Sequence, residues 1–161
     1  MATPEVQPPQ ASLTGTVIGR FRVGARLGRG GMGEVYVAED TTLKRKVALK
    51  RVAPALRDDP AHVTRMFKEA QRASSLTHPC VASIFDVLNE AGEIVLVMEY
   101  VEGISLRERL KQKPPVEEVL RIVEQCAGAL KAALEKSIIH GDVKPENIMI
   151  TSGCHAKLLD F

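Results

Sequence analysis

Three polar residues are crowded into one short segment near the C-terminal end of this 161-residue chain. Asp142 lies five positions before Asn147, and Lys144 stands between them. The carboxylate can accept a proton, the ammonium supplies a fixed positive charge, and the amide oxygen can ligate a hard cation such as Mg²⁺. Apolar residues on both sides should hold the segment rigidly. A short apolar strand at the end of the chain then presents one further carboxylate, Asp160.

Three glycines, Gly28, Gly30 and Gly33, form a GxGxxG pattern that has more than one interpretation. A dinucleotide fingerprint requires a strand before the glycines and a helix after them. Here the β-rich run 35–37 follows instead, which favours a β-hairpin. Without side chains, the turn of such a hairpin can bring backbone N–H groups close to phosphates. The glycines alone fit a plain flexible hairpin equally well.

Lys50 closes the apolar strand expected at residues 46–52, so its ammonium must find an anion or reach water. Glu69 borders the apolar face of the helix expected after this strand. A carboxylate at that place could hold the ammonium against a phosphate group. A strand-end lysine and a solvated glutamate are each ordinary, so the pair indicates a site only together with the glycines.

The elements that position these residues follow from the spacing of apolar side chains. We expect antiparallel strands beginning at residue 20 and at 34–38, 46–52, 81–88 and 94–100. A helix should follow the run Asp58-Asp59-Pro60, which is a good N-terminal start signal, because apolar residues recur after it at helical spacing. Residues 1–14, which are rich in proline, should form a flexible tail.

A second, longer helix is expected at residues 116–136, and it is apolar on two sides. One stripe comprises Val116, Val119, Leu120, Val123, Ala127, Leu130 and Leu134, and the second comprises Ile122, Cys126, Ala129 and Ala133. A helix of this kind is normally buried on both sides. Because little sequence follows it, we expect this chain to expose the second stripe and to be poorly soluble or inactive alone.

Composition excludes several classes of function. With 22 basic and 20 acidic residues the net charge is +2, which gives no reason to expect a nucleic-acid or membrane partner. Cys80, Cys126 and Cys154 form no CxxC pair and are expected to be reduced thiols in the cytoplasm. The longest strongly apolar run, 94–98, is too short to cross a bilayer, and residues 1–10 lack the apolar stretch of a secretory signal.

Together these motifs resemble the bacterial members of the eukaryotic-type serine/threonine protein kinases, over about residues 19–161. The phrase Gly-Gly-Met-Gly-Glu-Val-Tyr at 30–36 is especially similar to the bacterial branch. The resemblance implies an α+β fold. A five-stranded antiparallel sheet with one main helix would occupy residues 15–100, and a hinge with an incomplete, mainly helical second lobe would occupy 101–161. It also implies ATP, Mg²⁺ and a protein substrate that offers a Ser or Thr hydroxyl.

The same resemblance gives roles to the residues of the C-terminal segment. Asp142 would be the catalytic base that orients the attacking hydroxyl, and Lys144 would stabilise the transferring phosphoryl group. Asn147 and Asp160 would hold Mg²⁺. A hydrophobic stack joining the two lobes would comprise Ala73, Ile84, His140 and Phe161.

For the nucleotide, the resemblance implies that Lys50 binds the α- and β-phosphates and pairs with Glu69. Met98 would be the gatekeeper beside the adenine, and Ser105 would stand near the ribose. The full set assigned to the nucleotide is Leu27, Gly28, Gly30, Gly33, Val35, Ala48, Lys50, Glu69, Met98, Glu99, Val101, Ser105 and Met149.

The sequence departs from the family at two places. Gly141 stands where many relatives have an arginine that pairs with a phosphorylated activation loop, so activation by phosphorylation is not expected. The chain stops at Phe161, before the glycine, activation segment and Ala-Pro-Glu motif that follow in relatives. The resemblance therefore covers the ATP side of the domain.

Two other functions stay open. The run 140–142, followed by an asparagine, also resembles aminoglycoside and choline kinases, although the sequence at 144–146 and the complete glycine turn argue against a small-molecule kinase. A pseudokinase or nucleotide-binding interaction module would need no catalysis. The intact residues that argue against it are Lys50, Asp142, Asn147 and Asp160.

Overall fold

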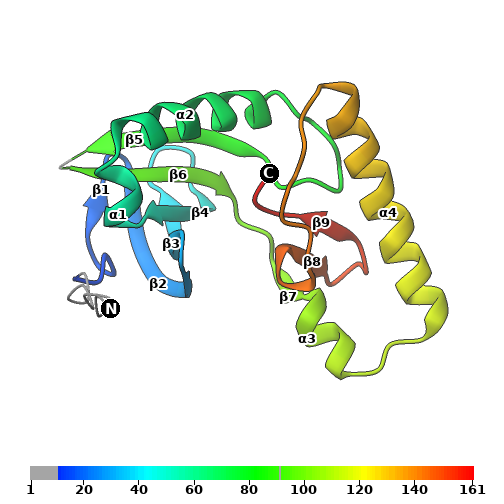
Figure 1. Ribbon diagram of the computed structural model, residues 1–161. Helices are drawn as coiled ribbons and strands as arrows, with labels where there is room; N and C mark the ends of the chain where they lie inside the picture. The colour runs from blue at the N-terminus through cyan, green and yellow to red at the C-terminus, as the bar shows by residue number, and fades with distance from the viewer. Residues whose placement is uncertain (1–10, 91) are drawn as a thin grey trace, which may run out of the picture.

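The computed structural model describes residues 11–90 and 92–161 of the chain. Figure 1 shows a large sheet with α2 beside it in one half, and a small sheet with two further helices in the other. The large sheet is antiparallel, with strand order β1-β2-β3-β4-β6-β5, and the small sheet has the order β7-β8-β9. The fold is therefore α+β, as expected, but the large sheet has six strands rather than five.

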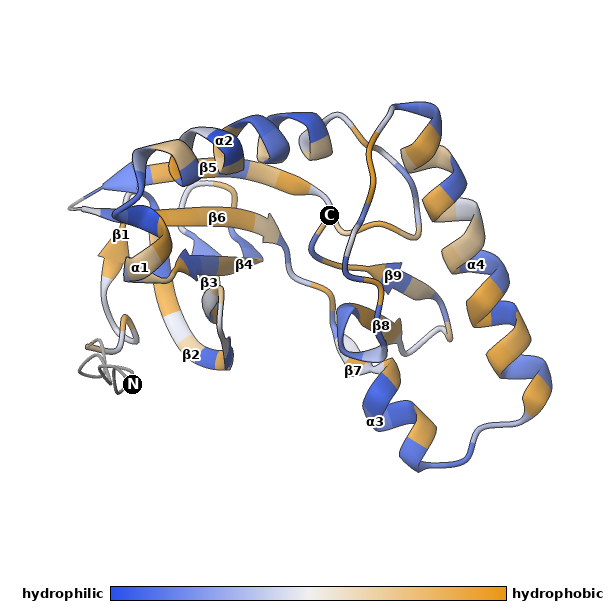
Figure 2. Cartoon of the chain, viewed as in Figure 1, coloured by the Kyte–Doolittle hydropathy of each residue, from blue (hydrophilic) through white to orange (hydrophobic). Residues whose placement is uncertain are grey.

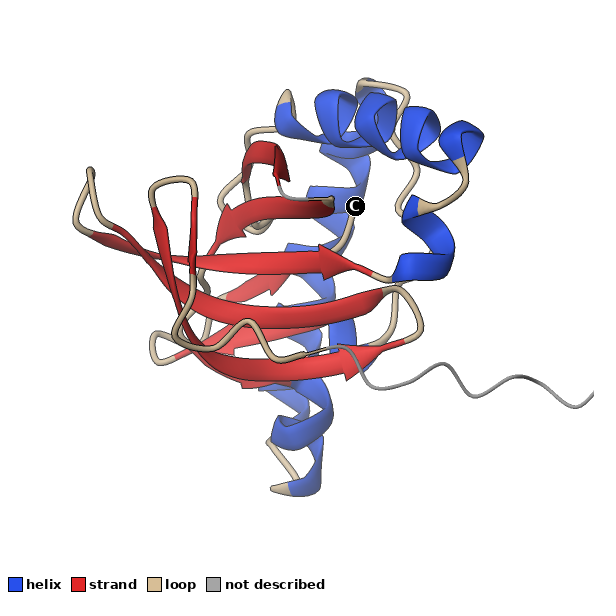
Figure 3. Ribbon diagram, turned by 90° about the vertical axis from the view of Figure 1, so that its left-hand side faces the viewer, coloured by secondary structure: helices blue, strands red, loops and turns tan. Residues whose placement is uncertain are grey.

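The additional strand is β1, which spans two residues and pairs with the start of β2 through Ile18 and Phe21. A strand of this length shows no periodicity, which explains why the sequence did not predict it. Figure 3 shows the strands of the large sheet, with α2 packed beside them. The large sheet comprises β1 (Val17–Ile18), β2 (Phe21–Gly30), β3 (Gly33–Asp40), β4 (Arg45–Val52), β5 (Ile84–Glu90) and β6 (Glu93–Glu99). The small sheet comprises β7 (Gly103–Ser105), β8 (Ile148–Thr151) and β9 (Ala156–Leu158).

Two of the helices, α2 and α4, were predicted, and the start of α2 shows the expected capping. The helix α2 begins at Pro60, and the carboxylate of Asp59 accepts a hydrogen bond from the N–H of Ala61. The sequence analysis missed α3, although Ser105 and Glu108 form a complete capping box at its start. The helices are α1 (Pro54–Arg57), α2 (Pro60–Ser74), α3 (Leu106–Lys111), α4 (Val116–Glu135) and the 3₁₀ turn η1 (Pro145–Asn147).

The strand predicted at residues 81–88 begins later, at Ile84, because the residues before it pair with the other sheet. Val81 forms a parallel bridge with Leu158 of β9. The N–H of Ala82 donates to the carbonyl of Leu158 at 2.9 Å, and the N–H of Leu158 donates to the carbonyl of Cys80 at the same distance. These backbone bonds fasten the two halves of the molecule together.

The helix α4 buries the stripe that was expected to be exposed. Ile122, Cys126, Ala129 and Ala133 pack against β8 and β9 in the core of the second half. The other stripe faces outward, with Val116, Leu120, Val123 and Leu134 exposed. Figure 2 shows apolar residues recurring along this helix. The prediction was wrong because periodicity shows that the helix has two apolar stripes but does not show which of them packs against the small sheet.

Residues 1–10 of the predicted flexible tail lie outside the described residues, whereas residues 11–14 are held in place. The carbonyl of Ala11 accepts a hydrogen bond from Arg51 at 2.9 Å. The N–H of Leu13 donates to the hydroxyl of Tyr36 at 3.4 Å, and its side chain packs on the core of the large sheet. Residues 11–14 thus contact the large sheet through the backbone of Ala11 and through Leu13.

Candidate active site

A cleft of about 930 Å³ lies between the large sheet and the second half of the chain. It gathers residues from both halves, and it brings together most of the residues predicted to form a site. Those that line it are Leu27, Gly28, Val35, Ala48, Lys50, Glu69, Met98, Glu99, Val101, Ser105, Asp142, Asn147, Met149 and Asp160. Gly30, Gly33 and Lys144 belong to the same elements but lie outside this lining.

Lys50 reaches across the cleft to Asp160. Its Nζ lies 2.8 Å from Oδ1 of Asp160, so a cation from β4 meets a carboxylate from the end of the chain. Asp160 has a positive φ of 58°, an uncommon conformation for a residue other than glycine. Aspartate adopts this left-handed conformation more readily than most residues with a side chain.

The predicted ion pair between Lys50 and Glu69 is not formed among the described residues. Glu69 lines the same cleft from α2, but its side chain is exposed to solvent. The ammonium of Lys50 instead takes the carboxylate of Asp160 as its partner. Sequence spacing placed Glu69 correctly on the helix face near the sheet, but it could not rank two carboxylates that approach one lysine from different elements.

The segment with Asp142 folds into a compact group of hydrogen bonds. Nζ of Lys144 lies 2.6 Å from Oδ2 of Asp142, and Nδ2 of Asn147 donates to the same oxygen at 3.0 Å and to the Asp142 carbonyl at 2.9 Å. The hydrogen bond from Lys144 lowers the pKa of Asp142 below its usual range, and this outweighs the effect of burial. The same bond raises the pKa of Lys144. Both groups are therefore charged at neutral pH.

His140 fastens this segment to the strand that carries Asp160. Its Nδ1 accepts a hydrogen bond from the N–H of Asp142 at 3.2 Å, so its Nε2 carries the proton and donates to the carbonyl of Leu159 at 2.7 Å. The His140 ring packs on Phe161 with centroids 4.6 Å apart. The N–H of Leu159 also donates to the carbonyl of Asn147. The two segments therefore form one rigid unit.

The donor atoms in this unit fit Mg²⁺. Asn147 uses its amide nitrogen for both bonds to Asp142, which leaves its Oδ1 to face a cation. Asp160 gives one oxygen to Lys50 and retains the other. Within the described residues no group of three or more His, Cys, Asp or Glu side chains could hold a metal alone. Mg²⁺ suits such a sparse set because it usually keeps several waters and takes phosphate oxygens as ligands.

The glycine turn is a β-hairpin, as the favoured interpretation required, with Gly30 opposite Gly33 at its end. Gly33 has a φ of 137°, and a Cβ added there would lie 1.8 Å from the carbonyl oxygen of Arg51. This glycine is therefore required by close packing against β4. Gly31 and Met32, which the sequence analysis did not assign, line the cleft instead, beside Gly28.

The connection after β6 forms the other wall of the cleft. Glu99 is anchored twice, because its Oε1 lies 2.7 Å from Nζ of Lys157 and its Oε2 accepts from the N–H of Ser83. The Ser105 hydroxyl, which was expected near a ribose, accepts from the N–H of Glu108 at 3.2 Å and thereby caps α3. Any contact to a sugar would have to share this hydroxyl.

A protein-family profile described as "protein kinase domain" matches residues 21–161. The chain belongs to the protein kinase family. It is 43% identical over 149 residues to the serine/threonine-protein kinase PknD of Mycobacterium tuberculosis, covering 91% of this chain and 22% of that protein. It is 40% identical over 147 residues to the serine/threonine-protein kinase PrkC of Bacillus subtilis, covering 90% of this chain and 23% of that protein. The chain thus spans less than a quarter of the length of these curated relatives.

The kinase fold is also shown by solved structures. The crystal structure of the Mycobacterium tuberculosis PknI kinase domain matches with a TM-score of 0.82 and 33% identity, and the match covers 94% of this chain and 63% of that one. Protein kinases in general use ATP and a divalent metal ion. None of the helices in the described part of this kinase chain has the length and apolar character needed to cross a membrane.

Two acidic residues that line the kinase cleft were not predicted. Glu108 and Glu146 line it, and Glu146 forms an ion pair of 2.6 Å with Arg107 of α3. Glu146 lies inside the predicted segment 138–150, and Glu108 forms half of the capping box. The capping pattern of Ser105 and Glu108 in the sequence was sufficient to find Glu108.

Proposed function

We propose that this chain carries the ATP-binding and catalytic residues of a protein serine/threonine kinase, which transfers the γ-phosphoryl group of ATP to a Ser or Thr hydroxyl. The observation that supports this most directly is the contact of 2.8 Å between Lys50 and Asp160. The contact joins the lysine to which we assign the phosphates and the carboxylate to which we assign the metal ion, in a cleft that Gly28 and Gly31 of the glycine hairpin also line. The names of the relatives, all serine/threonine kinases, point to the same acceptor class.

In this proposal the adenine lies between apolar side chains of the two halves. Val35 and Ala48 cover it from the large sheet, and Met149 covers it from β8, all three at the cleft surface. Backbone groups of Glu99 and Val101 bond its polar edge, while Met98 closes the back. The N–H groups of the hairpin and the ammonium of Lys50 then bind the phosphates.

Asp142 accepts the proton of the attacking hydroxyl. Its lowered pKa keeps it ionised at neutral pH, as a proton acceptor must be. Lys144, bonded to the same carboxylate, lies where it can stabilise negative charge on the group in transfer. Mg²⁺, held by Asn147 and Asp160, would neutralise charge on the phosphate oxygens and leave the chain's own residues to orient the hydroxyl.

We also propose that activity does not depend on a phosphorylated activation loop. Gly141, at the position of the arginine in many relatives, has a φ of 76°. A residue with a side chain would be strained in this conformation, so the backbone itself suits glycine here. Without a guanidinium at this place, a phosphate has no partner from residue 141.

The test is phosphoryl transfer by the natural protein that contains this chain, using radiolabelled ATP, Mg²⁺ and a mixture of protein substrates. We expect phosphoserine or phosphothreonine, and a loss of about 10³-fold or more in Asp142→Asn with ATP affinity retained. Glu135→Gln, on the exposed end of α4, is the matched control. ATP binding without transfer would favour a nucleotide-binding module, and transfer to a small molecule alone would favour the related small-molecule kinases.

A further inference from the structure

The face of the large sheet that points away from the cleft holds a group of buried charges that the proposed function leaves unused. Glu34 and Arg51 are opposite each other on β3 and β4 and are only 4% and 5% exposed. Successive residues of a strand point to opposite faces, so the two lie directly behind Val35 and Lys50 of the cleft. Charges are rarely buried in this way unless they are fully paired.

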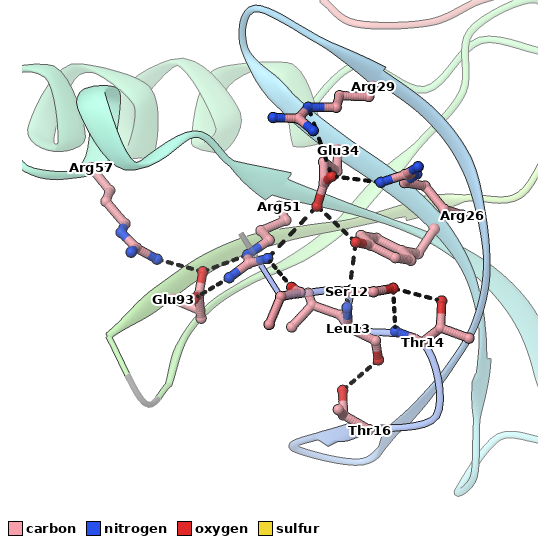
Figure 4. Close-up of polar contacts among 12 residues, drawn as sticks. Ser12, Leu13, Thr14, Thr16, Arg26, Arg29, Glu34, Arg51, Arg57 and Glu93 are labelled. Atoms are coloured by element: carbon pink, nitrogen blue, oxygen red, sulfur yellow. Dashed lines mark hydrogen bonds and ion pairs between the residues drawn. The ribbon is translucent and has the colours of Figure 1, made fainter. Parts of the chain in front are cut away.

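The pairing is dense (Figure 4). Arg51 donates to both carboxylate oxygens of Glu93, at 2.8 and 2.6 Å, and its Nη1 lies 3.6 Å from Glu34. Arg57 lies 2.5 Å from Glu93, and the Tyr36 hydroxyl donates to Glu34 at 2.7 Å. Burial alone would raise the pKa of Glu34, but the hydrogen bonds from Tyr36 and arginine lower it overall. The network is therefore ionised and rigid.

The network reaches the glycine hairpin from both of its arms. Glu34 directly follows Gly33 on β3, and it accepts from Arg26 of β2 at 3.0 Å, with Arg29 of β2 at 3.9 Å. The carbonyl of Arg51 packs against Gly33 so closely that a Cβ could not be inserted. One carboxylate and one guanidinium thus hold the two strands that position the phosphate-binding turn and Lys50.

The N-terminal strap, residues 11–18, covers this network. The Ala11 carbonyl accepts a hydrogen bond from Nη1 of Arg51, and the N–H of Leu13 donates to the Tyr36 hydroxyl. The Leu13 side chain packs on the core beneath, and the strap continues into β1. Beneath the strap, Glu34 and Arg51 are buried, and ion pairs are stronger where less water reaches them.

We propose that Glu34 and Arg51 are positioning residues of the nucleotide site, and that docking of the N-terminal strap over them sets the rigidity of the glycine hairpin. Undocking would admit water to the network, weaken the links between β2, β3 and β4, and loosen the turn. The strap would then be a control element, through which a binding event or modification that undocks residues 11–18 lowers the affinity for ATP. The affinity part rests on the proposed function, whereas the rigidity part does not.

The first test compares Glu34→Gln with Glu39→Gln, a matched change on the same strand at an exposed ion pair with Arg22. Amide hydrogen exchange reports on residues 28–33, and titration reports on the affinity for Mg²⁺-ATP. We expect Glu34→Gln alone to speed exchange in the hairpin by about fivefold or more and to weaken ATP binding about threefold to tenfold. Equal results for both variants, or faster exchange spread evenly into α4, would overturn the positioning role.

The second test undocks the strap with Leu13→Asp and uses Val17→Asp, an exposed position of the same strap, as its control. We expect the hairpin to loosen only in Leu13→Asp. Tyr36→Phe removes just the hydroxyl between strap and Glu34, and it should give a smaller change of the same kind if Leu13→Asp does not fold. A hairpin as protected in Leu13→Asp or Tyr36→Phe as in the control would overturn the role of the strap. If the unaltered chain fails to bind ATP, that result would count against the proposed function only. The role of the strap in hairpin rigidity is decided by hydrogen exchange, which needs no ATP.

Discussion

Lys157 of β9 and Glu99 at the end of β6 form an ion pair of 2.7 Å that joins the two halves of the molecule beside the hinge. The second oxygen of Glu99 accepts from the N–H of Ser83, so the carboxylate is held from both sides. Neither side chain is fully exposed. Together with the backbone bridge between Val81 and Leu158, this pair limits how far the cleft can open.

Lys157→Met should lower the free energy of unfolding by about 1 kcal/mol. Solvent screening weakens this partly exposed ion pair, but the substitution leaves the partly buried carboxylate of Glu99 without its cation. The substitution keeps most of the side-chain volume. Urea unfolding followed by circular dichroism measures the change. Lys157→Arg, which retains the charge, should lose less, and equal losses for the two variants would show that the ion pair contributes nothing.

Gly33→Ala should be strongly destabilising. The added Cβ would overlap the carbonyl of Arg51 at 1.8 Å, and the φ of 137° is itself strained for alanine. We expect a loss of about 2 kcal/mol or more in the free energy of unfolding. Gly31→Ala is the matched control, since a Cβ there has no atom within 4 Å among the described residues. A similar stability for both variants would contradict this account of the hairpin.

Much of the fold was predictable because it is encoded locally. The hairpin turn at Gly30 and Gly33 was confirmed, as was a helix at the start signal 58–60, since each depends on residues within one turn. Pairings between distant segments were not predictable. Val81 leaves its expected strand because a partner at Leu158 satisfies its backbone, and periodicity carries no information about such a partner.

The site shows the same division between local and distant information. Spacing alone singled out Asp142, Lys144 and Asn147 as one polar group, and hydrogen bonds join the three side chains in the structure. The partner of Lys50 was wrong, since the choice between Glu69 and Asp160 depends on how elements far apart in the chain approach one another. The charged network behind the hairpin was missed for the same reason.

Asp160→Asn should weaken the binding of ATP only when Mg²⁺ is present. The substitution removes the carboxylate charge that we assign to the metal, while the apolar walls of the cleft are unchanged. Titration of a fluorescent ATP analogue in Mg²⁺ should show about tenfold weaker binding than in the unaltered chain. In EDTA the loss should disappear, because without Mg²⁺ the Asp160 carboxylate only competes with phosphate for Lys50. A loss of equal size in both buffers would argue against a metal at Asp160.

Stability should fall in acid because of carboxylates with lowered pKa values. Hydrogen bonds from Arg51 lower the pKa of Glu93 from its ordinary value of 4.5, and burial opposes them only in part. A group whose pKa is lowered by folding stabilises the protein above its unfolded pKa, and this contribution is lost as the pH falls through the folded pKa. The free energy of unfolding should therefore change little from pH 7 to about 5 and then decrease. Glu93→Gln should be less stable at pH 7 and should show a shallower decrease below pH 5, and an unchanged slope would exclude Glu93 as a cause.

Shortening a side chain to alanine should be costly on one face of α4 and nearly neutral on the other, even at neighbouring positions. Ile122 is 1% exposed and packs against β8 and β9, whereas Val123 is 57% exposed. Ile122→Ala should lower the free energy of unfolding by about 2–5 kcal/mol, because it removes buried methyl groups and leaves a cavity. Val123→Ala should change it by less than about 0.5 kcal/mol, since alanine favours the helix and little apolar surface is lost. Urea denaturation measures the free energy of unfolding of both variants. A larger loss in Val123→Ala than in Ile122→Ala would mean that the outward stripe is covered in solution.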